Sequence, residues 1–551
     1  MMKKHRSLAR QSASAVAVHP QGTQTARLVV LFAIAALAAV SLLPAAEREL
    51  TGRIVDANTG EPIARAHVLI RVLQIGPSAP EATLLSEADG TFKVTNLPDG
   101  QYQVLCDKPG YLPVNQMMAA MPPGMKPDDK RTAGVVMKMT AQAAIEGTVV
   151  DERDMPANAV VQLSSQQVVN GRRQWQSARS DNTDETGAFR IWGLPAGRYY
   201  VSVSARLPGM LATKPLAYPP FFYPSATDIA GAQPVDLKAG DEAEIKIKLP
   251  PPVPAYTVSG SVDTTSTSIG LSLVRQPGSQ GFQRSSGEIS IDQRTKAFRF
   301  THVTPGAYLL QASVWQTSVN PLSTNLPVVV GNSDLTGIRL TPAPTGIDGT
   351  VRLEDGTSQR PAGFVSVQSD RMTSGAPLDA DGKFHIPSIE PGTYRILPQL
   401  NGSQTCVQSV LSGGHDVRDG LTIAAGVAPD PIDIVMSSHC GSIDVSLSPS
   451  DATLPPNLMA YLLRKTGDQV NLERMGGFQG VRSSDGAGHF LIRGVAPGDY
   501  VVYVWPNDAP IEYTNPEFMR PFESFGQRVT VSADSEATVT VDKPLLLPAK
   551  N

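Results

Sequence analysis

The residues best suited to contact a ligand lie in one loop rich in aromatic residues and proline. Four aromatic side chains fall within six positions, with two prolines among them and a third directly after them. They are Tyr218, Phe221, Phe222 and Tyr223. Exposed aromatic rings on a rigid loop can stack on a sugar ring or on an extended peptide. The same loop can instead fold back over an open sheet edge, and we favour this second interpretation. Trp175 and Trp192, in the same part of the chain, fit either one.

The eight histidines show none of the arrangements of common catalytic or metal sites. The sequence contains no His-Glu-x-x-His, no Gly-x-Ser-x-Gly and no phosphate-binding glycine loop. His302, His385 and His489 each lie near a recurring Phe, but at different offsets, whereas a shared metal site would need a shared offset. We therefore predict no catalytic residues, no metal site and no cofactor, and a protein that is not an enzyme.

Two loops contain several carboxylates each, and carboxylates are common ligands of calcium. Asp379 and Asp381 precede a glycine in one loop, and Asp181, Asp184 and Glu185 lie in the other. Neither set has the ligand spacing of a dedicated calcium loop or its closing Glu. We therefore predict that these aspartates form turns.

A pattern of Phe, Gly and Tyr recurs five times along the chain without a change in spacing. Gly follows Phe by eight residues and Tyr follows it by ten, with an aliphatic residue three positions before the Gly and a Pro beside it. The triplets are Phe92/Gly100/Tyr102, Phe189/Gly197/Tyr199, Phe298/Gly306/Tyr308, Phe384/Gly392/Tyr394 and Phe490/Gly498/Tyr500. A repeat about every hundred residues indicates whole domains in tandem.

The elements around this pattern are two strands joined by a reversal. Asp89-Gly90 predicts a tight turn into a strand, in which Phe92 and Val94 alternate with polar residues. The Pro/Gly pair then reverses the chain, and a second strand begins at the Tyr. This arrangement resembles the tyrosine corner of Greek-key sandwiches, in which the ring is buried and its hydroxyl bonds to nearby backbone. We predict that the Phe and Tyr of all five triplets are core residues.

The opening of the first repeat adds further motifs. Residues 50–56 read Leu-Thr-Gly-Arg-Ile-Val-Asp, residues 59–62 read Thr-Gly-Glu-Pro, and residues 66–68 read Ala-His-Val. Together with the Phe and Tyr motifs, they resemble the carboxypeptidase regulatory-like domain. The opening Gly recurs at Gly147, Gly260, Gly349 and Gly441. The resemblance implies seven-stranded, transthyretin-like (prealbumin/Ig-like) Greek-key sandwiches, related to carbohydrate-binding-like folds, in a bacterial cell-envelope protein. It concerns an accessory domain and implies no peptidase.

The first 46 residues resemble an export signal. They contain no Asp or Glu, carry five Lys or Arg, and include an apolar run at residues 28–43. Cleavage near residues 45–46 and retention of residues 28–46 as an anchor remain open alternatives. Removing the five leader charges from the formal net charge of -4 leaves about -9 for the rest. This charge argues against nucleic acid as a partner and predicts membrane attachment only through the N-terminal segment.

Three cysteines remain in a chain predicted to reach an oxidising compartment. Cys406 lies on the strand after the fourth triplet and Cys440 lies at the joint to the fifth repeat, so the two are candidates for a disulfide. Cys106 lies on the strand that begins at Tyr102, where we expect a small buried residue.

The composition predicts an all-β chain, because Gly (47 residues) and Pro (46 residues) are abundant and no long stretch has helical periodicity. The predicted parts are a signal peptide or signal anchor at 1–46 and five sandwiches at 47–141, 142–252, 253–344, 345–438 and 439–551. Proline-rich residues 250–254 and 342–344 are expected to be stiff joints that favour an extended string. A short helical insert is expected in the fifth sandwich after Asn515-Pro516.

Three functions are compatible with these features. The first is a non-catalytic structural, adhesive or display protein that is exported to the periplasm or cell surface. The second is an envelope protein that binds a polysaccharide, which the related fold permits without establishing it. The third is an accessory or regulatory subunit of an exported enzyme or outer-membrane transporter, with an envelope protein as its partner.

Overall fold

A computed structural model of the protein describes residues 48–547, apart from several internal segments. The segments left out are 74–80, 98–100, 119–132, 208–214, 277–286, 316–320, 344–345, 355–361, 370–372, 388, 402–404, 419, 425–426, 449–456, 467–468, 474–480 and 483–487. The predicted signal or anchor at 1–46 also lies outside the described residues. Within the described part, no helix is both long and apolar enough to cross a membrane. The chain divides into two compact units, residues 1–141 and 142–551.

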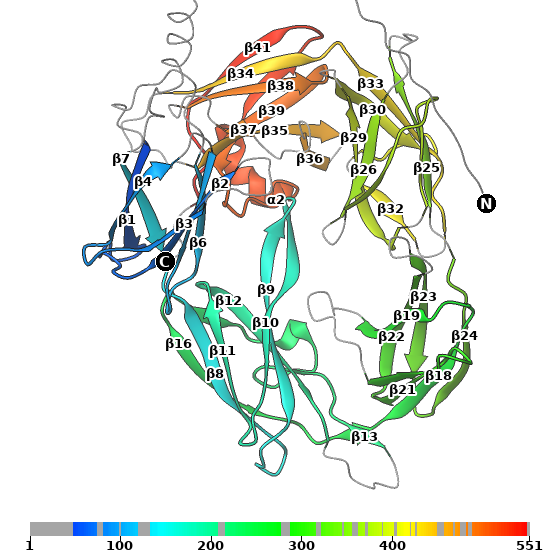
Figure 1. The fold of residues 1–551 in the computed structure, drawn as a ribbon. Helices are drawn as coiled ribbons and strands as arrows, with labels where there is room; N and C mark the ends of the chain where they lie inside the picture. The colour runs from blue at the N-terminus through cyan, green and yellow to red at the C-terminus, as the bar shows by residue number, and fades with distance from the viewer. Residues whose placement is uncertain are drawn as a thin grey trace, which may run out of the picture. The chain divides into compact units, whose positions relative to one another are not determined.

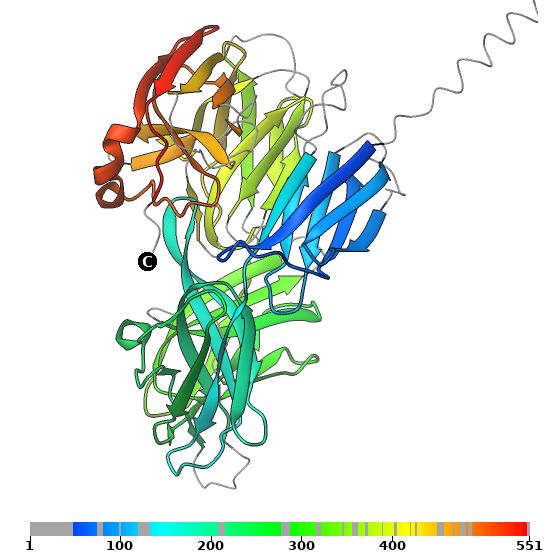
Figure 2. The same cartoon turned by 90° about the vertical axis from the view of Figure 1, so that its left-hand side faces the viewer.

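The first unit contains one β-sandwich, drawn in blue in Figures 1 and 2. In one sheet, β1 (Arg48–Asp56) lies between β4 (Thr91–Leu97), which is antiparallel to it, and β7 (Ala133–Met139), which is parallel to it. The other sheet has the order β3 (Glu81–Leu85), β2 (His67–Leu73), β5 (Gln101–Asp107) and β6 (Val114–Met118). The strand of Phe92 and the strand that follows it therefore belong to different sheets.

The same central trio of strands recurs four times in the second unit. A first strand lies between an antiparallel strand that carries the Phe and a parallel last strand. The trios are β11 (Ala188–Leu194), β8 (Ala143–Val150) and β16 (Glu242–Lys248); β21 (Ala297–Val303), β18 (Tyr256–Val262) and β24 (Leu335–Leu340); β28 (Lys383–Ile386), β25 (Ile347–Leu353) and β33 (Ile432–Ser437); and β38 (His489–Val495), β34 (Gly441–Leu447) and β41 (Glu536–Val541).

Each facing sheet is built on an antiparallel pair that contains the Tyr strand. The pairs are β9 (Ala159–Val169) with β12 (Gly197–Ala205), β19 (Ser268–Gln276) with β22 (Gly306–Trp315), β26 (Gly363–Gln368) with β29 (Gly392–Leu400), and β35 (Leu458–Thr466) with β39 (Gly498–Pro506). The flanking strands are β10 (Arg172–Asn182), β14 (Phe221–Phe222), β15 (Val235–Leu237), β23 (Pro321–Val330), β27 (Thr373–Pro377), β32 (Leu421–Ile423), β36 (Gln469–Glu473), β37 (Val481–Arg482) and β40 (Gln527–Val531). The predicted class, tandem all-β Greek-key sandwiches, is confirmed.

The strand number varies among the sandwiches. In the described residues, the first and third have the seven strands that the resemblance implied, the third including β20 (Glu288–Ile291). The other three have additional short strands. In the fourth, β30 (Cys406–Ser412) pairs with β33, in the sheet of the first strand, and is extended by β31 (His415–Asp416). The corresponding β23 of the third sandwich pairs instead with the Tyr strand β22.

The recurring Phe and Tyr residues lie in the cores of these sandwiches. All five Phe rings are buried, and so are the Tyr rings whose side chains are described. These tyrosines donate a hydrogen bond to the carbonyl four residues earlier: Tyr199 to Pro195 (2.8 Å), Tyr308 to Thr304 (2.7 Å), Tyr394 to Glu390 (2.8 Å) and Tyr500 to Ala496 (2.8 Å). The side chain of Tyr102 lies outside the described residues. The Phe packs one sheet on the core and the Tyr fixes the turn that leads to the other.

The fifth repeat departs from the predicted alignment of the opening Gly. In the other four sandwiches that Gly is paired with the recurring Phe, for example Gly349 with Phe384. In the fifth, Phe490 is paired with Val445, and Gly441 is paired with Val495. The equivalence of Gly441 with the other opening glycines is therefore wrong, because the register of β34 places Val445 opposite the Phe.

The two proline-rich joints attach to the sandwich that precedes them. Val253–Pro254 forms the short strand β17, which pairs with β13 (Leu216–Ala217) of the second sandwich. Ala343 exchanges two backbone hydrogen bonds of 3.2 Å with Ser323 of the third. These residues are therefore strand-like edges of a sandwich, because their backbone groups find partners there, and the polyproline interpretation is wrong for them.

The insert of the fifth sandwich consists of α2 (Pro516–Met519) followed by the 3-10 helix η3 (Arg520–Phe525). Asn515 caps α2, with its side-chain oxygen accepting from the backbone N–H of Glu517 (3.1 Å) and Phe518 (3.4 Å). A shorter 3-10 helix, η2 (Ile229–Gly231), lies in the second sandwich.

Candidate functional site

The aromatic loop of the second sandwich lies against its own domain. Phe221 is 3% exposed and belongs to the core, and β14 pairs with β12 through Phe221–Val203 and Phe222–Ser202. Tyr218 and Tyr223 are half-buried against the same core. The loop thus extends the sheet along β12, which is the arrangement in which the rings cover a sheet edge.

Tyr218 has the most perturbed phenol of this loop. Its hydroxyl donates to Glu152 Oε2 over 3.3 Å. Burial, followed by the nearby Glu152 carboxylate, raises the pKa of Tyr218 to about 12. The phenol therefore stays protonated at neutral pH and acts as a hydrogen-bond donor within the fold.

Trp192 is the aromatic residue of this sandwich that solvent reaches most. It lies on β11 with 58% of its surface exposed, and the guanidinium carbon of Arg179 stands 5.7 Å above its ring. A cation at this distance from an indole face gives a cation–π interaction. Trp175 packs edge-on against Tyr200, with ring centroids 4.7 Å apart. Among the described aromatic side chains of this sandwich, Trp192 beside Arg179 is therefore the one most open to solvent.

The histidines near the recurring Phe residues pair individually with carboxylates. His385 Nδ1 lies 2.7 Å from Asp348 Oδ1, and the His302–Glu288 and His489–Asp444 pairs are 3.9 Å apart. These side chains are largely exposed. Among the residues that the structure describes, no three or more His, Cys, Asp or Glu side chains form a group that could hold a metal ion. The three histidines each lie beside a surface carboxylate, in separate sandwiches.

The loop aspartates form turns through their side-chain oxygens. Asp184 Oδ1 accepts from the backbone N–H of Thr186 (2.8 Å) and Ala188 (2.9 Å) and from the Thr186 hydroxyl (2.7 Å). The Thr186 hydroxyl, and then these backbone donors, lower the pKa of Asp184. Asp379 Oδ1 likewise accepts from the backbone N–H of Asp381 and Lys383, each over 2.8 Å.

Two of the cysteines form a disulfide, and the third is a free thiol. Cys406 and Cys440 form a disulfide that ties the start of β30 to the joint before β34. Cys106 is a free thiol with 1% of its surface exposed. Burial raises the pKa of the Cys106 thiol to about 11, so it behaves as a small apolar core residue.

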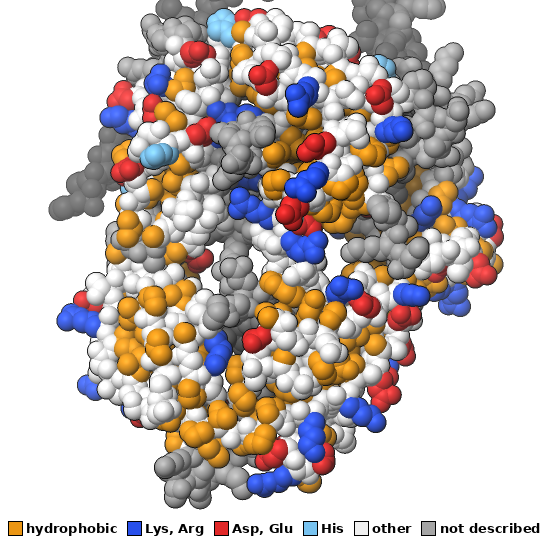
Figure 3. Space-filling model, turned by 180° about the vertical axis from the view of Figure 1, so that it is seen from behind, with side chains coloured by type: hydrophobic (Ala, Val, Ile, Leu, Met, Phe, Trp, Pro, Cys, Tyr) orange, Lys and Arg blue, Asp and Glu red, His pale blue; other side chains and the backbone are white. Residues whose placement is uncertain are grey.

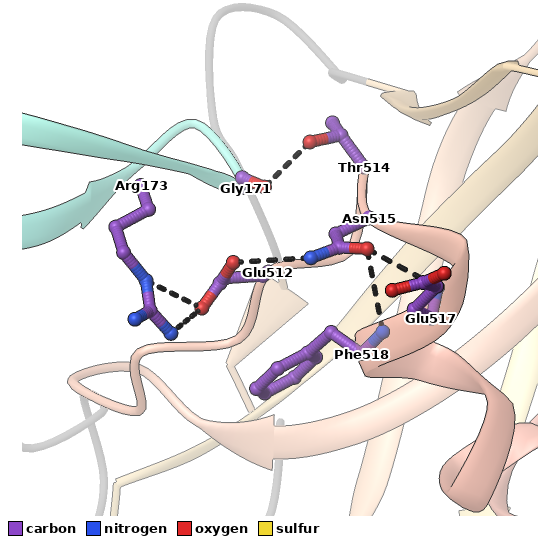
Figure 4. A network of polar contacts seen from close by, with 7 residues as sticks. All are labelled: Gly171, Arg173, Glu512, Thr514, Asn515, Glu517 and Phe518. Atoms are coloured by element: carbon purple, nitrogen blue, oxygen red, sulfur yellow. Dashed lines mark hydrogen bonds and ion pairs between the residues drawn. The ribbon is translucent and has the colours of Figure 1, made fainter.

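A polar network between the second and fifth sandwiches was not found from the sequence. Arg173 at the tip of the β9–β10 hairpin pairs with Glu512, next to the insert (Figure 4). The two residues are 339 positions apart, so no local pattern could join them. Asn170-Gly171 is nevertheless a strong hairpin-turn signal and indicates the position of the tip.

Positive and negative side chains are interspersed over the face drawn in Figure 3, without a large field of one sign. Opposite charges on such a surface can pair with each other.

The sheets define a chain of tandem β-sandwiches. The model of the carboxypeptidase regulatory-like domain matches residues 49–133, so the resemblance is confirmed for the first sandwich. A search of curated proteins gave no match.

Three solved structures show weak similarity to this chain. GBS52, the minor pilin of Streptococcus agalactiae, is 16% identical over 38% of this chain and 99% of its own, with a TM-score of 0.20. A Streptococcal ancillary pilin is 12% identical over 54% and 99%, with a TM-score of 0.18. The Bacillus anthracis TIE protein is 10% identical over 74% and 78%, with a TM-score of 0.15.

Proposed function

We propose that this protein is a non-catalytic structural or adhesive protein that displays tandem sandwich modules outside the cytoplasm. The observation that carries the proposal is the structural role of the recurring Phe and Tyr residues. The Phe rings are buried in the cores, and each described Tyr hydroxyl bonds to its own turn. The repeated pattern thus maintains a scaffold, which leaves the loops and surfaces free for display.

The Cys406–Cys440 disulfide supports a location outside the cytoplasm. Disulfides persist in the periplasm and at the cell surface, whereas cytosolic thiols are kept reduced. Residues 1–46 would supply the export signal, and residues 28–46 the membrane anchor if they are retained. Thiol trapping in intact cells, followed by fractionation, tests this location. A fully reduced pair in the cytosolic fraction would contradict it.

Adhesion itself is tested by coating beads with the purified chain and measuring their retention on host cells or envelope fragments. Retention above that of beads coated with an unrelated β-sandwich is expected. A specific pull-down of one envelope enzyme or transporter, without bead retention, would favour the accessory-subunit alternative.

A polysaccharide is a second candidate ligand, and the exposed Trp192 beneath Arg179 is the feature that favours it. A sugar ring could displace the guanidinium and stack on the indole. A glycan array with the parent chain and Trp192→Ala tests this role. Equal binding by both chains, or binding by neither, rejects Trp192 as a sugar platform.

A further inference from the structure

We propose that the second and fifth sandwiches dock on each other within one chain, through a contact that we call the hairpin clasp. Its two sides are the hairpin tip at Asn170–Arg173 and the Glu512–Thr514 segment that precedes the helical insert (Figure 4). This inference goes beyond the proposed display function and does not depend on it.

The tip of the β9–β10 hairpin is a tight turn with a defined backbone conformation. β9 and β10 are joined by a two-residue turn, with Val169 paired to Arg172. Asn170 (φ 52°) and Gly171 (φ 73°) both adopt the left-handed conformation that a type I′ turn requires. Asn and Gly tolerate this conformation best, so the sequence fixes which backbone atoms stand at the tip.

The tip contacts the fifth sandwich through Gly171. Thr514 Oγ1 donates to the Gly171 carbonyl over 2.5 Å, and the Thr514 backbone N–H points to the same oxygen over 3.4 Å. A β-carbon on Gly171 would stand 2.6 Å from Cε2 of Tyr513. The backbone of the tip therefore lies directly on the Tyr513 ring, at a distance that only glycine allows.

An ion pair stands beside this contact. Arg173 Nε donates to Glu512 Oε1 over 3.0 Å, and Nη2 donates to the same oxygen. The Glu512 side chain is only 7% exposed, whereas that of Arg173 is 56% exposed. A carboxylate removed from water needs a charged or hydrogen-bonding partner, and Arg173 supplies one from the other sandwich.

The surface that receives the tip is held in place from behind. Asn515 Nδ2 donates to Glu512 Oε2 over 3.4 Å while its oxygen caps α2. Tyr513 stacks on Trp505 with ring centroids 6.4 Å apart, and Trp505 stacks on Tyr461 at 4.0 Å. These rings form a second buried cluster of the fifth sandwich. Because cap and cluster order the segment, docking costs little additional conformational entropy.

The clasp has a consequence for the arrangement of the modules. Stiff joints predicted sandwiches held apart along a string, yet residues 343 positions apart are in contact here. Sequence-distant modules are therefore coupled, and loss of the clasp would free the second sandwich from the fifth.

Spin labels at Gln167→Cys on β9 and Glu517→Cys on α2 test the clasp by pulsed dipolar distance measurement in the full chain. The buried Cys106 and the Cys406–Cys440 disulfide should remain unlabelled, which the parent chain checks. We expect one narrow, short distance. Arg173→Glu should lower the ratio of docked to undocked chains at least tenfold, since a charge-assisted bond becomes a repulsion. Arg172→Glu, the same charge change one residue away, should leave the ratio unchanged.

Two substitutions of Thr514 test the same contact with a smaller change, so that misfolding of the Arg173→Glu chain cannot be mistaken for loss of docking. Thr514→Val removes the hydroxyl donor at nearly constant shape and should lower the ratio about fivefold, whereas Thr514→Ser should preserve it. A broad distribution in the parent, or one unaffected by both Arg173→Glu and Thr514→Val, overturns the proposal. Mixing singly labelled chains provides the last check. A short distance in that mixture would place the contact between copies and would overturn the intramolecular clasp.

Discussion

The ring of Phe384 occupies the space that a side chain on Gly349 would need. A β-carbon on Gly349 would stand 2.4 Å from Cζ of Phe384 and 2.6 Å from the carbonyl oxygen of Ile432. Gly52 and Phe92 repeat this relationship in the first sandwich, at 2.3 Å. In the first and fourth sandwiches, the opening Gly and the recurring Phe therefore pack as one unit.

Gly349→Ala should consequently destabilise the fourth sandwich. The added methyl group meets both a core ring and backbone of the neighbouring strand, so overpacking should lower the free energy of unfolding by about 1 to 3 kcal/mol. Scanning calorimetry of the full chain measures the shift. Gly331→Ala is the control, because its β-carbon would have no neighbour within 4 Å. Equal shifts for both variants would show that the general effect of replacing a glycine, rather than contact with the Phe384 ring, determines the change in stability.

The fourth tyrosine corner makes a separate prediction. Tyr394→Phe removes the 2.8 Å bond to the Glu390 carbonyl and should lower the free energy of unfolding by about 1 kcal/mol. Phe384→Ala empties a buried site and should cost roughly 3 to 5 kcal/mol. Chemical denaturation followed by circular dichroism compares the two. A Tyr394→Phe variant as unstable as Phe384→Ala would mean that the hydroxyl does more than fix the turn.

The fold was predictable where one residue type serves one structural purpose. A Phe and a Tyr ten residues apart, with Pro and Gly between them, specify two strands in different sheets, and the burial of Phe189 and Tyr199 follows. The alignment of the first strand of the fifth sandwich was not predictable. Gly441 matches the sequence motif, but Val445 is the residue that is paired with the recurring Phe490. Register depends on pairing with β38, which one strand's sequence does not reveal.

The candidate site was less predictable than the fold. The four aromatics of the loop look alike in sequence, yet Phe221 enters the core while the other three stay half-buried. Trp192, outside the loop on the regular strand β11, is exposed. Which ring is buried depends on how β14 adds to β12, a tertiary property. The contact of Arg173 with Glu512 is even harder to predict from the sequence, because it joins segments from two domains.

The turn aspartates predict a stability that depends on acid pH. Hydrogen bonds from Thr186 and Ala188 hold the pKa of Asp184 below its ordinary value of about 3.9. A depressed carboxyl pKa stabilises the fold fully above the unfolded value, and this contribution is lost as pH falls through the folded one. The second sandwich should therefore weaken as pH falls below about 5, through the unfolded pKa of about 3.9 and towards the lowered folded one.

Asp184→Asn should flatten part of this acid dependence, since the amide oxygen can still accept the turn hydrogen bonds but does not titrate. Thermal unfolding at several pH values measures the slope. Glu185→Gln removes the same charge from the same turn and should leave the slope nearly unchanged. A slope in Asp184→Asn equal to that of the parent would show that other carboxylates cause the acid loss.

The three cysteines should react in two steps, Cys106 on denaturation and the disulfide pair only after reduction. Cys106 is buried opposite Val68 and its pKa is raised to about 11, so at pH 8 only about a thousandth of the thiol is ionised even where reagent reaches it. The native chain should therefore resist iodoacetamide. Denaturant alone should expose one alkylation site, because Cys406 and Cys440 remain joined. Denaturant with reductant should expose all three, and intact mass spectrometry counts them. Alkylation of the native chain would show that the first sandwich opens, and three sites without reductant would show that the disulfide is not formed.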